Sequence, residues 1–248
     1  MASPAENKQQ QQQQQQQLVP RFEWDFDVPD TPFWKDLDFR VARNFLVCYE
    51  PSELEKIPFG DHASRPESHR LEFLLAELQS KLAAQQASLA PEEIHEAKPD
   101  LWRRLLLGIE TLQRYLGMPE EEAETIRLVL SNTAGDARVP WLNMLADLDL
   151  RNGNLVEAES AAREVLPWMQ KHEKLGVDSP QALGTTRTII HSMWKQGGGR
   201  VDEARRLVAE TEAVIQGMRL GKFSKYQDEE RRMLQDLVVS LEPQGSGG

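Results

Sequence analysis

Apolar side chains recur at intervals of three and four residues through most of this chain, which is the spacing of amphipathic helices. The longest such stripe comprises Val201, Ala204, Leu207, Val208, Thr211, Val214, Ile215 and Met218. Glycine, proline and asparagine separate the stripes, and no segment alternates apolar and polar residues as a half-buried strand would. The pattern predicts an all-α protein whose helices are joined by short turns.

Capping residues indicate where the expected helices begin and end. Asp100, Pro119 and Ser179 suit the start of a helix, whereas Gly117 and Gly153 suit the turn that follows one. Together with the apolar stripes, they predict helices near residues 71–82, 101–116, 119–130, 141–151, 180–196, 201–218 and 225–241.

An aromatic-rich segment precedes these helices. A helix is expected to start at Asp30-Thr31-Pro32, because a capping side chain precedes a proline in the first turn. Ser52 and Glu55 resemble a capping box for a second, short helix that Pro58 and Gly60 would end. We interpret the segment as an N-terminal cap on the later helices. Its aromatic residues are expected in the core: Phe22, Trp24, Phe26, Phe33, Trp34, Phe39, Phe45, Tyr49 and Phe59.

Both ends of the chain are expected to be disordered. A glutamine run occupies residues 9–17 and the chain ends in EPQGSGG, and neither segment can bury apolar surface. A polyglutamine tract is typical of a eukaryotic protein. The expected organisation is a polyglutamine tail at 1–20, an aromatic-rich cap at 21–66, a helical domain at 67–242 and a disordered tail at 243–248.

Two parts of the helical domain are similar to each other. The segment WLNMLADLDLRNGNLVEAESAAREVL aligns with TTRTIIHSMWKQGGGRVDEARRLVAE when Gly153 is placed on Gly197. The second segment has two extra glycines in its turn, after which Gly-Arg-Val-Asp-Glu-Ala at 199–204 matches Gly-Asn-Leu-Val-Glu-Ala at 153–158 and pairs Ala204 with Ala158. A third, looser copy contains Gly117.

This pattern resembles the tetratricopeptide repeat, in which small residues let two antiparallel helices approach closely. Ala146 and Ala158 take those positions here. The linker from Leu175 to Pro180 is similar to the Leu-Gly-x-x-x-Pro linker of the longer, kinesin light-chain type of repeat. The resemblance covers about residues 101–218 and implies a right-handed α-α superhelix of about three helical hairpins. Pro167 would lie inside a second helix and is expected to kink it.

The resemblance also implies a function, namely the binding of a peptide or protein partner in a concave groove. The first helix of each pair lines that groove, with exposed positions four residues apart. The implied groove residues are Thr111, Tyr115, Asn143, Asp147, Arg151, Arg187, His191 and Lys195. Their positive members, Arg151, Arg187 and Lys195, would suit an acidic peptide or a chain-terminal carboxylate.

Charge and hydropathy argue against other classes of partner. The chain has 40 Asp and Glu against 29 Lys and Arg, a net charge of -11, which would repel a phosphate backbone. No stretch approaches the roughly 18 apolar residues of a membrane span, and the N-terminus has no signal-peptide core. We therefore expect no nucleic-acid or membrane partner and a cytoplasmic location, with the nucleus as an alternative.

The sequence also gives little support for catalysis or metal binding. Cys48 is the only cysteine, and its apolar neighbours predict a buried, inert thiol. Glu92, Glu93, His95 and Glu96 have no second histidine at helical spacing and fit the acid-rich first turn of a helix. We expect no cofactor and no enzymatic activity. Two hypotheses remain: an adaptor or scaffold, and an accessory subunit or small-molecule-binding protein of a metabolic pathway.

Overall fold

The computed structural model describes residues 26–242, and every regular element in this range is a helix. The predicted all-α class is therefore confirmed for the described part of the chain. The expected disordered tails, with the glutamine tract and the aromatic residues Phe22 and Trp24, lie outside the described residues.

The described residues form two compact units, an N-terminal unit (residues 26–148) and a C-terminal unit (residues 149–242). The aromatic-rich cap expected at residues 21–66 therefore does not form a separate compact unit. Its end at residue 66 lies inside the N-terminal unit, which also contains the first predicted long helices.

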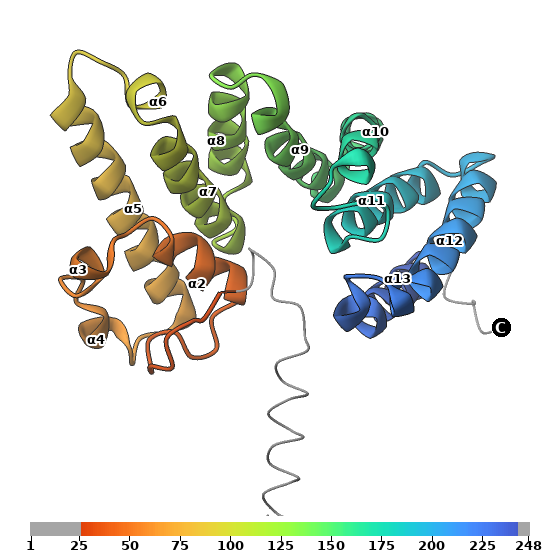
Figure 1. Ribbon diagram of the computed structural model, residues 1–248, viewed down its shortest axis with the longest axis horizontal. Coiled ribbons are helices and arrows are strands. Elements are labelled where there is room, and N and C mark those ends of the chain that lie inside the picture. The colour runs from red at the N-terminus through yellow and green to blue at the C-terminus, as the bar shows by residue number, and fades with distance from the viewer. Residues whose placement is uncertain (1–25, 243–248) are drawn as a thin grey trace, which may run out of the picture. The chain divides into compact units, whose positions relative to one another are not determined.

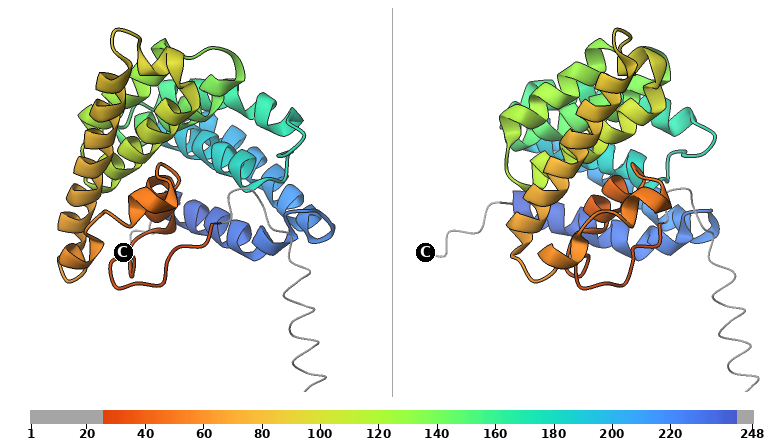
Figure 2. Two further views of the ribbon diagram at one scale, coloured as in Figure 1. Left: turned by 60° about the vertical axis from the view of Figure 1, so that its left-hand side comes forward. Right: turned by 90° about the vertical axis from the view of Figure 1, so that its left-hand side faces the viewer.

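The N-terminal unit is organised around one central helix. Its elements are α2 (Phe39–Leu46), α3 (Pro51–Leu54), α4 (Phe59–His62), α5 (Glu67–Leu89), α6 (Ile94–Ala97), α7 (Pro99–Tyr115), α8 (Pro119–Ser131), η1 (Gly135–Arg138) and most of α9 (Val139–Arg151). Helix α7 packs against α2, α5, α6 and α8 (Figures 1 and 2). This central place explains why α7 buries more than one of its faces.

Helix α2, the first in the described residues, begins later in the sequence than predicted. Its N-cap is Asp38, whose side chain accepts a hydrogen bond of 2.8 Å from the backbone N–H of Arg40. The expected start at Pro32 was wrong, because residues 32–36 form turns and Asp36 has a φ of 67°, which no right-handed helix contains.

The short helix α3 also has a different cap from the predicted one. The capping box joins Glu50 to Glu53 instead of Ser52 to Glu55: the backbone N–H of Glu50 donates to Glu53 Oε2 at 2.7 Å. The predicted end was also displaced, because α3 stops at Leu54 and Pro58 instead precedes the next helix, α4.

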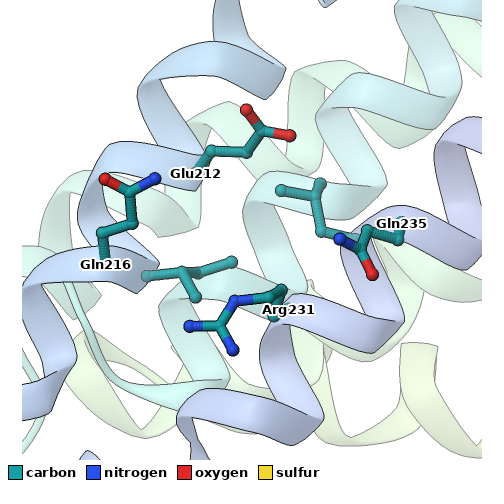
Figure 3. Close-up of a pocket in the computed structure, with 6 residues that line it drawn as sticks. Glu212, Gln216, Arg231 and Gln235 are labelled. Carbon is teal, nitrogen blue, oxygen red and sulfur yellow. The ribbon is translucent and has the colours of Figure 1, made fainter.

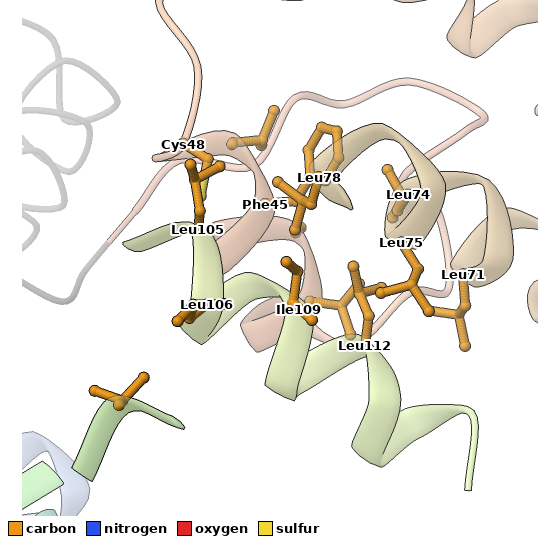
Figure 4. Close-up of a cluster of buried hydrophobic side chains, with 14 of the residues drawn as sticks. Phe45, Cys48, Leu71, Leu74, Leu75, Leu78, Leu105, Leu106, Ile109 and Leu112 are labelled. Carbon is orange, nitrogen blue, oxygen red and sulfur yellow. The ribbon is translucent and has the colours of Figure 1, made fainter. Parts of the chain in front are cut away.

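A single hydrophobic cluster joins the cap segment to the long helices (Figure 4). Phe33, Trp34 and Phe45 are buried in it, as expected, whereas Phe39 is 45% exposed and was wrongly placed in the core. Gly108 marks the closest approach of helices α2, α5 and α7. A Cβ atom there would lie 2.6 Å from Leu78 Cδ1 and 3.0 Å from the carbonyl oxygen of Asn44.

The C-terminal unit is a second helical bundle. Its elements are α10 (Leu155–Lys171), α11 (Pro180–Gln196), α12 (Arg200–Gly217), η2 (Met218–Leu220), η3 (Ser224–Tyr226) and α13 (Gln227–Leu241). Helix α11 packs against α10, α12 and α13. Ser179 caps α11 as predicted, accepting a hydrogen bond of 3.2 Å from the N–H of Ala182. Pro167 lies inside α10, also as predicted.

A buried carboxylate links three helices of this unit. Glu159 on α10 accepts hydrogen bonds from Arg163 at 2.6 Å and from Gln196 at 2.9 Å, and it pairs with Arg200 at the start of α12. Glu159 is 7% exposed, so these partners are what makes burial of its charge tolerable.

The two similar sequence segments contain matching local features. The aligned residues Gly153 and Gly197 have φ values of 80° and 76°, a left-handed conformation that favours glycine. Ala158 and Ala204 are both fully buried. Gly117, in the looser third copy, has a φ of 69°. The three segments thus each have a glycine of positive φ just after a helix.

Candidate interaction surfaces

The implied groove residues of α7 make contacts inside the N-terminal unit. Thr111 is 5% exposed, and its hydroxyl accepts a hydrogen bond of 2.9 Å from Asn44 on α2. Its expected exposure was wrong, because this face of α7 is covered by another helix. Tyr115 is partly exposed and its hydroxyl accepts a hydrogen bond of 2.7 Å from Arg40. Burial raises the pKa of Tyr115 to about 12.

The two implied groove residues of this unit on α9 are partly buried. Asp147 forms an ion pair of 2.8 Å with Arg114 on α7, and Asn143 has an intermediate exposure. The side chains of three implied groove residues, Thr111, Tyr115 and Asp147, thus each bind another helix of the N-terminal unit.

The other four implied groove residues lie in the C-terminal unit. Arg187 forms an ion pair with Glu230 on α13, with both side chains largely buried, so it serves as a structural link instead of an exposed cation. Arg151 and Lys195 are exposed. His191 is partly exposed, and burial, together with the charge of Lys195, lowers its pKa. The eight residues are therefore split between the two units.

A recess in the N-terminal unit was not predicted from the sequence. Its volume is about 440 Å³, and most of its accessible lining is apolar. It is bounded by α5, α6, α7 and α8, through Gln79, Leu82, Ala83, Gln86, Glu93, Ile94, His95, Trp102, Leu128 and Asn132. Leu128, at 47% exposed, is the most accessible large apolar residue among them. The feature of the sequence that could have indicated this recess is Leu128, an apolar residue that lies outside the buried stripe of α8.

Two polar side chains of the recess hold its backbone in place. Gln86 on α5 accepts a hydrogen bond of 3.0 Å from the N–H of Ile94 and donates one of 3.1 Å to the carbonyl of Glu92, which fixes α6 beside α5. Asn132 donates to the carbonyl of Leu128 at 2.9 Å and ties down the last turn of α8. The walls of the recess are thus preorganised.

A smaller pocket of about 190 Å³ lies between α12 and α13 in the C-terminal unit. Ile215 and Leu234 contribute apolar surface, and the labelled side chains around it are polar or charged: Glu212, Gln216, Arg231 and Gln235 (Figure 3). Arg231 also bonds Asp228 on its own helix at 2.7 Å. The pocket has room for a few waters or one small polar ligand.

The predicted burial of Cys48 is confirmed. Its thiol is 3% exposed and lies 3.2 Å from the carbonyl oxygen of Asn44, to which it donates. Burial raises the pKa of Cys48 to about 12. The thiol is therefore protonated at neutral pH, which does not favour a nucleophilic role.

Residues 26–242 also show neither a metal-binding cluster nor a membrane-spanning helix. No group of three or more His, Cys, Asp or Glu residues within this range is arranged to hold a metal ion. Among the same residues, no helix has both the length and the apolar character needed to cross a membrane. The comparisons with known proteins returned no match to a family model, a curated protein or a solved structure.

Proposed function

We propose that this protein is a non-catalytic interaction module of the tetratricopeptide type, and that it binds a peptide or protein partner at the recess of its N-terminal unit. The recess is the single observation that carries the proposal. The tetratricopeptide assignment is supported by the paired sequence segments and by the left-handed glycines Gly153 and Gly197.

The shape and lining of the recess favour a protein side chain as its occupant. Leu82, Ile94 and Trp102 provide an apolar floor on three different helices. The exposed residues Leu128 and Asn132 lie at its edge, so the recess is open to solvent. A bulky apolar side chain presented by a partner would fill it and displace water, as the central anchors of protein interfaces do.

The original groove hypothesis receives less support than the recess. Thr111, Asp147 and Arg187 each bind another helix of their own unit. If these side chains bound a partner, they would have to break those internal contacts. Lys195 remains an exposed cation that a partner could contact.

Selection from a random 16-residue peptide library tests the proposal. The full chain is expected to enrich peptides with a bulky apolar residue, and Leu128→Asp should reduce their affinity at least tenfold. Val239→Asp is the matched control, because Val239 is exposed on α13 in the other unit. Peptides that bind Leu128→Asp as tightly as the original chain would refute the assignment of the recess.

A small-molecule-binding function is the second candidate, because the recess volume lies within the range of about 300–1,000 Å³ found for ligand pockets. It makes a different prediction. Apolar fragments would raise the melting temperature of the original chain but not of Leu128→Asp, and no peptide would be enriched.

A further inference from the structure

We infer that the segment bound at the recess is basic, with a bulky apolar anchor flanked by lysine or arginine. This inference rests on the proposed function and adds the chemistry of the partner. The apolar lining of the recess selects only for an apolar side chain. Any preference for the charge of the partner therefore depends on the residues around the recess.

The negative charge of the described chain is concentrated in the unit that contains the recess. Residues 26–148 contain 22 Asp and Glu against 13 Lys and Arg, whereas residues 149–242 contain 15 against 14. A partner approaching the N-terminal unit therefore meets a negative potential, which favours a basic segment and disfavours nucleic acid and anionic lipid.

Exposed carboxylates lie in the lining of the recess and along α8, one of the helices that bound it. On α8, Glu124 and Glu121 precede Leu128 by four and seven residues, so all three lie along one face of the helix. Both glutamates are exposed. Glu93, which precedes α6, lines the recess itself and is also exposed.

The basic residues nearby do not cancel this charge. Arg127 is exposed beside Leu128 in the sequence. Arg103 on α7 pairs with Asp100, whereas Lys98, which donates a hydrogen bond of 2.9 Å to the neutral side chain of Gln85, keeps its positive charge. His95 lies against Trp102, with ring centroids 5.6 Å apart, and its Nε2 is 3.9 Å from Glu96 Oε1. The border keeps an excess of carboxylates over cations.

The arrangement assigns separate tasks to the two kinds of residue. Leu82, Ile94 and Leu128 would bury the anchor, which supplies affinity. Glu93, Glu121 and Glu124 would attract flanking lysines and arginines, which speeds encounter and rejects acidic partners. Because these carboxylates are exposed, salt should weaken their contribution.

The peptides selected above provide the probe. We expect the enriched sequences to carry an excess of Lys and Arg next to the anchor. For the most enriched synthetic peptide, the combined Glu93→Gln, Glu121→Gln and Glu124→Gln variant should weaken binding at least fivefold at 50 mM salt and reduce its salt dependence. The matched control is Glu157→Gln, Glu164→Gln and Glu210→Gln, which neutralises three exposed glutamates of the C-terminal unit and should change affinity less than twofold.

The outcomes separate the two proposals. Enriched peptides that are sensitive to Leu128→Asp but neutral or acidic would overturn this inference and leave the proposed function standing. Basic peptides that bind the triple Gln variant unchanged would overturn it as well. If no enriched peptide responds to Leu128→Asp, the proposed function fails, and the inference fails with it.

Discussion

Glu110 on α7 lies close enough to Glu122 on α8 for their carboxyl groups to interact, and both residues are buried in the N-terminal unit. Burial raises the pKa of Glu110 to about 7, and the negative charge of Glu122 acts in the same direction. In the folded unit Glu110 therefore keeps its proton up to a pH of about 7, whereas a glutamate in an unfolded chain has a pKa of about 4.3.

This pair should make the stability of the protein depend on pH. Since the folded state binds the extra proton, the stabilisation is complete below the unfolded pKa and is lost as the pH rises towards about 7. The loss should be on the order of 2 kcal/mol, and Glu110→Gln should flatten that part of the curve because the amide does not titrate. Urea unfolding of both proteins between pH 5 and pH 8 measures the difference. Glu121→Gln, at an exposed position, is the control, and an unchanged slope in Glu110→Gln would contradict the assignment.

In the C-terminal unit, the buried charges of Arg187 and Glu230 should each depend on the other, so that the loss of one partner is costly. Burial raises the pKa of Glu230, and the adjacent Arg187 only partly offsets this effect. Replacing Arg187 by methionine leaves a buried carboxylate without its partner and should cost about 3 kcal/mol. Replacing both residues by methionine should recover most of that loss. Chemical denaturation of the single and double variants tests this, and strict additivity of the two single effects would show that the residues do not interact.

Gly108 and Gly184 offer a matched pair of helical glycines. Alanine normally stabilises a helix by up to about 1 kcal/mol relative to glycine. At Gly184 the nearest atom to an added Cβ is Arg187 Nη2 at 3.7 Å, so Gly184→Ala should be neutral or stabilising. At Gly108 the contacts with Leu78 and Asn44 are too short, so Gly108→Ala should destabilise by about 1–3 kcal/mol. Thermal unfolding should give opposite signs, and equal shifts would mean that the three helices are not closely packed at Gly108.

The helix ends could be predicted where a capping residue or proline had no nearby competitor. Pro119 opens α8 and Ser179 caps α11, as the sequence indicated. At the start of α2, by contrast, Asp30 and Asp38 are both possible caps. Asp38 takes the role because the left-handed conformation of Asp36 interrupts the chain between them, and that conformation has no signature in the apolar pattern.

The candidate site was harder to predict, because burial does not follow hydrophobicity on the central helix. Periodicity finds an apolar stripe, but α7 also buries Glu110, Thr111 and Gln113, which bind partners on α2 and α8. Thr111 was therefore mistaken for a surface residue. The recess forms where four helices meet around Trp102, and such a tertiary arrangement cannot be read from the sequence. The only local feature in the sequence that pointed to it was Leu128, an apolar residue outside the buried stripe of α8.

Ala158 and Ala204 provide the sharpest test of the sequence repeat. They occupy equivalent positions in the two aligned segments, and both are fully buried, on α10 and α12. Helix α11 packs closely against both of these helices, so a leucine at either position has little space to enter. Each Ala→Leu replacement should destabilise the protein by about 1–3 kcal/mol through overpacking. Ala209→Leu is the control, because Ala209 is exposed on α12 and leucine is nearly as good a helix former as alanine. The measurement is the free energy of unfolding in urea. A large loss at only one of the two alanines would show that the segments are alike in sequence but not in packing, and neutrality at both would refute the proposed alignment.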